Sequence, residues 1–547
     1  MNLSISIIIS LIVSIIPLLS FIKGYKNSKV KLKEYIVSNK VECISLVIVL
    51  FACLLRTVCI DKFPAWFNQD EVSSGYEAYS VSNFGIDRNG VSYPVHFISW
   101  GNGQNVLYSY ILIPFIKILG LTVYSTRLPM AIISCISVLA WYYILKLNIK
   151  KIDKKFLTML SMFSFFPWLI MKSRWGLESN IFLDLILYAT FFINKYIDSK
   201  KKRYLFFSAF FIGISAYSYG TSYIFLPIYC LGVSAYLLKK KYVKIKEIIL
   251  PALLVLILVL PMIIFVCINY FDLEAIKIGK ITIPKMVISR LHETNLKEGS
   301  IIEGIIKNIL SNIFILLTRF DGVELNSTIF SVIISVIFSF TFILYFIERK
   351  NKENKNILDE LMYVWLIAAT LTIVFFSYRI IMNNNRINII IIPYLYFGIK
   401  SVININKNTL NKIIYILTVC FVIEYFTIYN IKLENNYNSK EYLEIIEYVQ
   451  TTENDKNIYI DNNIIKEPYI YYLFYTKMDP NYYFLNCDKK ITYRKNFSSE
   501  SISRIGNVYF YLPDEEDKNN IIITKKEEKE KFSNRNIKEF DNLILVY

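Results

Sequence analysis

Long apolar runs, separated by short polar loops, recur along most of this chain of 547 residues. A helix that rises 1.5 Å per residue needs about 20 apolar residues to cross a hydrocarbon core of about 30 Å. The runs Asn2 to Ile22, Val41 to Ile60 and Glu247 to Asn269 meet that length. Backbone polar groups in lipid must be satisfied within each segment, so these runs predict membrane-spanning α-helices.

About twelve such spans are expected, which predicts an all-α polytopic membrane protein. The first run lacks a basic lead and a small-residue cleavage site, so we expect a retained helix rather than a signal peptide. Several spans are short and need a thinner bilayer or interfacial ends. Besides the three runs above, the expected spans are Thr122 to Leu147, Phe156 to Met171, Ile181 to Asn194, Tyr204 to Tyr219, Thr221 to Leu238, Ser327 to Ile347, Leu361 to Tyr378, Ile387 to Ile403 and Ile413 to Tyr429.

The polar loops differ in charge, and the difference predicts the topology. The formal net charge is +17, but the cations gather in short loops between apolar runs instead of forming a nucleic-acid surface. That distribution is the positive-inside pattern, so these loops are expected in the cytoplasm and both termini outside. The basic loops are Lys23 to Lys40, Lys146 to Lys155, Lys195 to Arg203, Lys239 to Lys246, Arg349 to Lys355 and Lys400 to Lys412.

The remaining segments predict three parts of the chain. Residues 1–40 read as an additional helix with a basic loop, and residues 41–432 as a transmembrane domain with two long outside loops, Asp61 to Leu121 and Tyr270 to Asn326. Residues 433–547 alternate short strand-like and helical runs, which predicts a small extracytoplasmic α/β domain. Two apolar runs too short to span, Val106 to Leu119 and Ile301 to Leu317, are expected to be interfacial helices.

Adjacent carboxylates at Asp70 and Glu71 are the strongest candidates for chemistry, because they follow an apolar helix at the head of the first outside loop. Water there would keep both groups ionised. A carboxylate can accept a proton from an attacking hydroxyl or bind a divalent metal, Mg²⁺ or Mn²⁺, that neutralises a leaving phosphate. Asp70 is the candidate metal ligand. The alternative is a solvated acidic pair that caps a helix.

Outside arginines oppose the positive-inside trend and therefore need another reason. Arg290 and Arg386, followed by Arg174, are candidates to bind a phosphate group, since a guanidinium forks onto phosphate oxygens. The alternative is pairing with nearby carboxylates or contact with lipid head groups. In the first loop, Tyr93, Gln104 and Asn105 lie in a segment whose aromatic and glycine residues suit a sugar ligand, although an interfacial aromatic belt has the same composition.

Known nucleotide-binding and hydrolase motifs are missing from the sequence. The chain has two histidines and no HExxH, GxGxxG, Walker or GxSxG pattern, which weighs against a histidine-based zinc site and against nucleotide sugars or ATP as substrates.

The chain resembles the GT-C glycosyltransferase superfamily over roughly residues 40 to 430, and especially its bacterial family 39, protein O-mannosyltransferase and aminoarabinose transferase branch. The segments that carry the resemblance are Asp70-Glu71, Gly85 to Tyr93, Gly101 to Tyr108, Pro114-Phe115, Gly120, Arg127-Leu128-Pro129, Ser173 to Leu177 and Arg386-Ile387-Asn388 before Pro393.

This resemblance implies a glycosyltransferase that takes a sugar from a polyprenyl-phosphate donor at the outer leaflet of a bacterial cell membrane and passes it to an extracytoplasmic acceptor. It implies that Asp70, with Glu71, is the base or metal ligand. The first helix and the C-terminal domain depart from the superfamily pattern. Two other functions stay open: a transporter or flippase, which would favour ionisable residues within the bilayer, and a non-catalytic envelope-assembly protein.

Overall fold

In the computed structural model, the described residues are 2–28, 30–101, 103–288, 301–318, 328–348, 356–376, 384–405, 408–431, 433, 439–452, 456–493, 498–513 and 519–547. Their contacts divide the chain into two compact units. The first comprises Met1–Ile60, Met130–Leu260 and Thr294–Tyr425, and the second comprises Asp61–Pro129, Pro261–Glu293 and Phe426–Tyr547. The three domains expected from the sequence, 1–40, 41–432 and 433–547, stay predictions.

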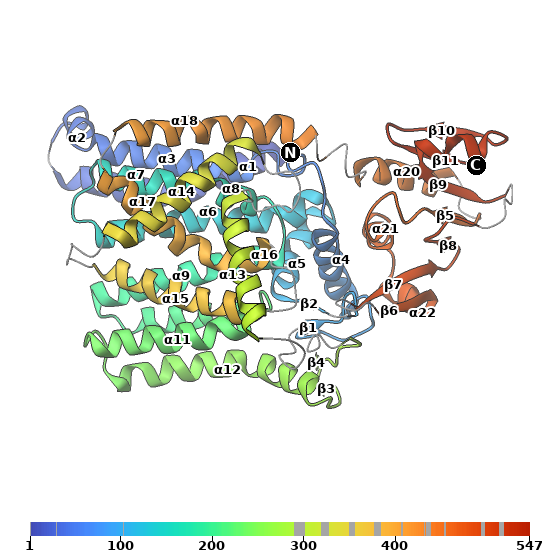
Figure 1. The fold of residues 1–547 in the computed structure, drawn as a ribbon, viewed down its shortest axis with the longest axis horizontal. Helices are drawn as coiled ribbons and strands as arrows, with labels where there is room; N and C mark the ends of the chain where they lie inside the picture. The colour runs from blue at the N-terminus through green and yellow to red at the C-terminus, as the bar shows by residue number, and fades with distance from the viewer. Residues whose placement is uncertain are drawn as a thin grey trace. The chain divides into compact units, whose positions relative to one another are not determined.

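The first unit is helical throughout its described residues, and many of its helices lie side by side (Figure 1). Two further helices run on into the second unit, α6 (Val123–Asn148) and α12 (Ile245–Tyr270). The helices of the first unit are α1 (Asn2–Ser28), α2 (Leu32–Ser38), α3 (Lys40–Thr57), α7 (Lys154–Ser164), α8 (Pro167–Ser173), α9 (Glu178–Ser199), α10 (Arg203–Ser215), α11 (Ser222–Lys239), α13 (Ile301–Thr318), α14 (Ile329–Glu348), α15 (Ile357–Phe376), α16 (Asn384–Ile387), η3 (Asn388–Ile390), α17 (Ile391–Ile405) and α18 (Asn408–Glu424).

Nine of the described helices are long and apolar enough to cross a membrane, or up to eleven if each of two bent helix pairs is one span. The expected multi-pass helical protein is therefore confirmed, whereas the number twelve is not. The difference lies at α10, which has 13 residues. At 1.5 Å per residue it is about 20 Å long, short of the bilayer core.

One of the bent pairs interrupts an expected single helix. The run Phe156 to Met171 forms α7 and α8, which meet at 47°. Phe166, directly before Pro167, has an extended backbone (φ −65°, ψ 129°) and precedes the first residue of α8. A residue before proline is disfavoured in the α conformation, so the helix ends and a new one begins with the proline at its first position.

The second unit combines short helices with a seven-stranded sheet, drawn in red and orange in Figure 1. The sheet order is β10-β11-β9-β5-β8-β7-β6, in which β5 runs parallel to both of its neighbours. Its strands are β5 (Ile458–Ile460), β6 (Cys487–Tyr493), β7 (Ser498–Ile505), β8 (Val508–Tyr509), β9 (Ile521–Lys525), β10 (Ile537–Glu539) and β11 (Leu543–Val546). The other elements are α4 (Gln69–Phe84), β1 (His96–Phe97), β2 (Gln104–Asn105), α5 (Leu107–Leu119), β3 (Ile276–Ile278), β4 (Ile281–Ile283), η4 (Tyr425–Tyr429), α20 (Ser439–Thr452), α21 (Pro468–Thr476), α22 (Pro480–Asn486) and η5 (Lys526–Phe532).

The C-terminal α/β region contacts the first outside loop within this second unit. The Tyr471 hydroxyl donates to the carbonyl oxygen of Phe67 at 2.6 Å, and the Tyr76 hydroxyl donates to the carbonyl oxygen of Met478 at 2.8 Å. The expected C-terminal sheet is confirmed, and these contacts attach it to the segment that holds the candidate carboxylates. Its side of the membrane stays a prediction.

Candidate functional site

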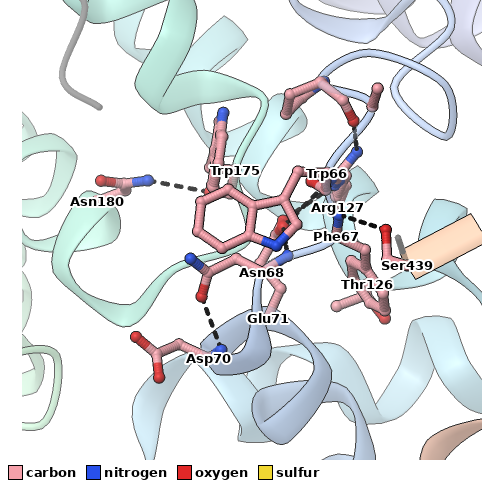
Figure 2. A network of polar contacts seen from close by, with 12 residues as sticks. Trp66, Phe67, Asn68, Asp70, Glu71, Thr126, Arg127, Trp175, Asn180 and Ser439 are labelled. Carbon is pink, nitrogen blue, oxygen red and sulfur yellow. Dashed lines mark hydrogen bonds and ion pairs between the residues drawn. The ribbon is translucent and has the colours of Figure 1, made fainter. Parts of the chain in front are cut away.

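Asn68 starts α4 with a capping box, and this local structure fixes where the two carboxylates point. The Asn68 side chain accepts from the backbone N–H of Asp70 at 2.8 Å, while the Glu71 carboxylate accepts from the backbone N–H of Asn68 at 3.2 Å. Together these bonds satisfy two N–H groups that a helix start otherwise leaves unpaired. Successive residues on a helix diverge by about 100°, so the carboxylates of Asp70 and Glu71 point in different directions (Figure 2).

Glu71 is fully buried and forms a fork-shaped ion pair with Arg127. Arg127 Nε and Nη2 lie 3.0 and 2.9 Å from the two carboxylate oxygens, and neither residue is exposed. The same guanidinium donates to the carbonyl oxygens of Pro64 and Trp66 at 2.7 and 2.6 Å. The expectation of two water-exposed carboxylates is therefore wrong for Glu71, because its charge is compensated by a buried arginine that also holds the preceding loop.

Asp70 is half-buried, and its carboxylate points away from the Glu71–Arg127 pair (Figure 2). Gln104 holds the backbone beside it. The Gln104 side-chain amide donates to the Asp70 carbonyl oxygen at 3.3 Å and to Ser74 Oγ at 3.0 Å, and it accepts from Ser73 Oγ at 2.7 Å. The structure thus brings together two of the predicted site residues, Asp70 and Gln104, and the Gln104 side chain supports the first turns of α4.

A second buried charge cluster joins α4 to the loop that follows it. Arg88 Nε lies 3.5 Å from a Glu77 carboxylate oxygen, and Arg88 Nη1 donates to Ser73 Oγ at 2.7 Å. Burial, reinforced by the charge of Glu77, raises the pKa of the neighbouring Asp87 to about 8, so this carboxyl is neutral at pH 7. Within the described part of the chain, neither Asp87 Oδ2 nor Arg88 Nη2 has a hydrogen-bond partner.

Aromatic rings from two distant segments flank Arg88. Its guanidinium carbon lies 4.7 Å from the ring centre of Trp100 and 5.9 Å from that of Tyr469. Trp100 and Glu467 both have positive φ, +63° and +56°, a conformation that costs a residue other than glycine about 1–3 kcal/mol. Such strain gathers at functional sites, so the first loop and the start of α21 are candidates for the same site.

Glu467 adds another carboxyl group to the second unit. Burial raises its pKa, the charge of Asp70 adds to that rise, and Lys466 and Arg88 oppose it. Enzymes build acid and base pairs from carboxyl groups whose surroundings push their pKa values apart, so the raised pKa makes Glu467 a candidate partner of Asp70. The sequence reasoning missed Glu467, because it lies about 400 residues after Asp70 in a segment expected to form a separate domain.

The other predicted residues lie as follows. Tyr93 is partly exposed, has a φ of +34° and contacts Gly85, while Asn105 is buried and pairs with His96 across β1 and β2. Their roles in substrate binding stay predictions.

The three candidate phosphate-binding arginines differ in what the structure shows. Arg174 is buried in the first unit, where it donates to the carbonyl oxygens of Leu55, Val58 and Cys59 at 2.6, 2.8 and 3.1 Å. These carbonyls lie at the C-terminal end of α3, so its guanidinium fastens a helix end. Arg386 is half-buried in α16. Arg290 lies outside the described residues.

A donor set for a metal is not assembled in the described part of the chain, where no group of three or more His, Cys, Asp and Glu side chains is placed to hold an ion. Asp70 as a metal ligand stays a prediction, and the reaction proposed below does not route a step through a metal.

Arg88 and Arg127 were also missed as site residues, although one signal could have found them. Both are cations on or next to the first outside loop, so the positive-inside argument that singled out Arg290 and Arg386 applies to them equally.

These helices and the sheet give the chain a GT-C fold, as expected. The structure of the aminoarabinose transferase ArnT from Cupriavidus metallidurans bound to undecaprenyl phosphate aligns with a TM-score of 0.51 and 9% identity, covering 94% of this chain and 98% of that chain. The apo structure of ArnT aligns with the same figures. At this identity the likeness shows the fold alone.

A weaker likeness is to the archaeal oligosaccharyltransferase AglB from Archaeoglobus fulgidus, in complex with an inhibitory peptide and a dolichol-phosphate. It aligns with a TM-score of 0.43 and 9% identity, over 79% of this chain and 63% of that one, which is too low to carry an argument. No protein-family model matches the chain, and no curated protein matches it significantly.

Proposed function

We propose that this protein is a membrane glycosyltransferase that moves a sugar from a polyprenyl-phosphate donor to an acceptor hydroxyl. The proposal is supported by the GT-C fold and by the undecaprenyl phosphate bound to ArnT, the protein that shares this fold. The observation that carries it is the separation of the two adjacent carboxylates. Glu71 is committed to Arg127, whereas Asp70 is half-buried at a helix start and interacts electrostatically with Glu467.

In the proposed reaction, the acceptor oxygen attacks the anomeric carbon of the donor sugar while Asp70 takes the acceptor proton. The bond between the anomeric carbon and the phosphate oxygen breaks, and its electron pair leaves with the polyprenyl phosphate. Glu71 is a positioning residue that fixes the first turn of α4 through Arg127. Glu467, whose pKa is raised, is the candidate group to hold the proton that Asp70 releases or to orient the acceptor.

Phosphate binding is assigned on charge and position to Arg386, directly before an expected span, and to Arg290, in the second long loop. Arg174 is less suited, because its guanidinium already donates to three backbone carbonyls. The sugar is a hexose or pentose, and the acceptor is a cell-envelope glycan, lipid or protein. Asp70 is also the candidate ligand for a divalent metal, Mg²⁺ or Mn²⁺.

The first test is a membrane assay with a panel of radiolabelled polyprenyl-phosphate sugars, scored by which label leaves the lipid. Asp70→Asn keeps the size of the side chain but cannot accept the proton, so turnover should drop by about a hundredfold or more. Asp488→Asn is the matched control, because that carboxylate has a side-chain exposure of 65% and lies on β6. Full activity of Asp70→Asn with an active panel member would refute the proposed mechanism.

The proposed topology has its own test. Cysteine placed at Asp541, an exposed position of the C-terminal region, in a Cys487→Ser background should react with an impermeant reagent in intact cells. Cysteine placed at Lys240, in a basic loop, should react only after lysis. The reverse result would refute the outer-leaflet site. Transport of the donor lipid without sugar transfer would favour the flippase alternative.

A further inference from the structure

An apolar cavity of about 280 Å³ lies among four helices of the first unit, α9 to α12. Its lining consists mainly of aliphatic and small side chains. On α10 it runs from Leu205 to Ile212, and on α12 from Ile248 to Leu256. At 1.5 Å per residue these stretches are roughly 10 and 12 Å long, so the cavity, called the channel below, extends along about two turns of each helix.

Small residues create the channel, and a close helix contact ends it. Ser208 and Ala209 on α10 face the cavity together with Ala252 on α12. Further along, the two helices touch, because a Cβ atom added at Gly213 would meet Leu258 Cδ1 at 2.6 Å. The Tyr217 hydroxyl also donates to the Leu258 carbonyl oxygen at 2.8 Å. The channel is therefore closed at this end.

The other end of the channel is surrounded by cations. On each of the four helices a lining residue lies two positions from a lysine or arginine, within two turns of the helix end. These pairs are Ile193 with Lys195, Leu205 with Arg203, Leu237 with Lys239, and Ile248 with Lys246. The exposed residues Lys201, Lys202 and Lys244 add to the same two loops.

We propose that this channel binds one acyl chain of an anionic glycerophospholipid, whose phosphate contacts the cations of the loops after α9 and α11. An apolar channel that is closed at one end suits a hydrocarbon chain, and the cations at its other end complement the phosphate. A soluble protein partner would not reach a channel flanked by candidate membrane spans, among which α9, α11 and α12 qualify by length and composition.

The occupant is assigned as a phospholipid and not as the polyprenyl-phosphate donor because of the charge pattern. Basic loops mark the cytoplasmic side, where anionic phospholipids attract them, whereas the proposed donor site lies on the other side. The short helix α10 gives the lipid a structural role. With only 13 residues it leaves part of the bilayer thickness unfilled, and an inserted acyl chain would pack beside it.

The test is native mass spectrometry of the purified full chain in neutral detergent, titrated with phosphatidylglycerol or phosphatidylcholine. We expect one phosphatidylglycerol to bind more tightly than phosphatidylcholine. Changing Lys201, Lys202 and Arg203 together to Gln should weaken the binding of phosphatidylglycerol on the order of a hundredfold. Each cation near an anionic lipid strengthens binding about fivefold, and three such contributions multiply. The control changes Lys150, Lys151 and Lys154 to Gln, which removes the same charge from another exposed basic loop.

The apolar part of the site has a matched pair of variants on α12. Ala252→Phe fills the channel and should abolish retention of the lipid, whereas Leu253→Phe changes the next residue, which is exposed and does not line the cavity. If Ala252→Phe does not yield folded protein, Ala209→Phe on α10 fills the same space.

Three outcomes would overturn the proposal. One is equal binding of the two phospholipids, and another is wild-type retention by both channel-filling variants. The third is displacement of phosphatidylglycerol by equimolar polyprenyl phosphate, which would make the channel a donor-lipid site. None of these readouts requires sugar transfer, so the result is independent of the proposed enzymatic activity.

Discussion

Breaking the Glu71–Arg127 pair should destabilise the protein more than any change at Asp70. The pair has two parallel contacts of 2.9 and 3.0 Å, both side chains are unexposed, and Arg127 also holds two loop carbonyls. Removing one member of a buried pair leaves the other charge uncompensated, which costs about 3–5 kcal/mol. Glu71→Gln and Arg127→Met should each lower the free energy of unfolding by that order.

The assay is thermal or denaturant unfolding of the purified protein, followed by tryptophan fluorescence, for both single variants and the double variant. Because the double variant leaves no unpaired charge, its loss should be clearly smaller than the sum of the single losses. Glu303→Gln is the control, since Glu303 pairs with Lys307 on an exposed helix face and should not shift the transition. Two single variants that unfold like wild type, or strictly additive losses, would refute the structural role assigned to Glu71.

The remaining predictions concern a buried acid, a candidate phosphate ligand and a helix cap. Asp87 has a pKa of about 8 in the folded chain, against an ordinary value of 3.8 for an Asp. Between these two values the folded chain binds more protons than the unfolded chain, so the free energy of unfolding should fall as pH rises from 3.8 to about 8. Unfolding at pH 6 and 9 should show this fall, and Asp87→Asn should flatten it; an unchanged slope would contradict the assignment. If Arg386 holds the leaving phosphate, Arg386→Lys should keep part of the turnover and Arg386→Ala should lose about a hundredfold, whereas near-normal rates in both would place the phosphate elsewhere. Glu424 accepts from the first two backbone N–H groups of α14 at 2.9 and 3.2 Å, so Glu424→Ala should cost about 1 kcal/mol of unfolding free energy or more, while a variant as stable as wild type would contradict that capping role.

The length of the apolar runs was enough to predict most of the long helices. The expected spans Thr122 to Leu147 and Glu247 to Asn269 match α6 and α12 within two residues at each end, because an apolar run of bilayer length has no other way to satisfy its backbone in lipid. The sequence also indicates the break between α7 and α8, because Pro167 marks it. Apolar strands such as β9 and β11 also fall among the strand-like runs expected within residues 433–547.

Other features depended on contacts between distant residues. The hairpin of β6 and β7 was not predicted, because its sequence is polar and lacks the alternation of a half-buried strand. The sheet places β5 between β8 and β9, which follow it by about 50 and 60 residues, and no local pattern specifies such an order.

The candidate site shows most clearly what only the tertiary structure decided. The sequence identified Asp70 and Glu71 as one acidic pair, but a helix turns by about 100° per residue and gives the two neighbours different surroundings. Arg127, 56 positions further on, pairs with Glu71, and burial in the second unit raises the pKa of Glu467, a residue from the far end of the chain. Residue types and their spacing therefore indicated where the candidate site lies, whereas the different surroundings of its two carboxylates depend on burial and charge pairing that arise only when remote segments pack together.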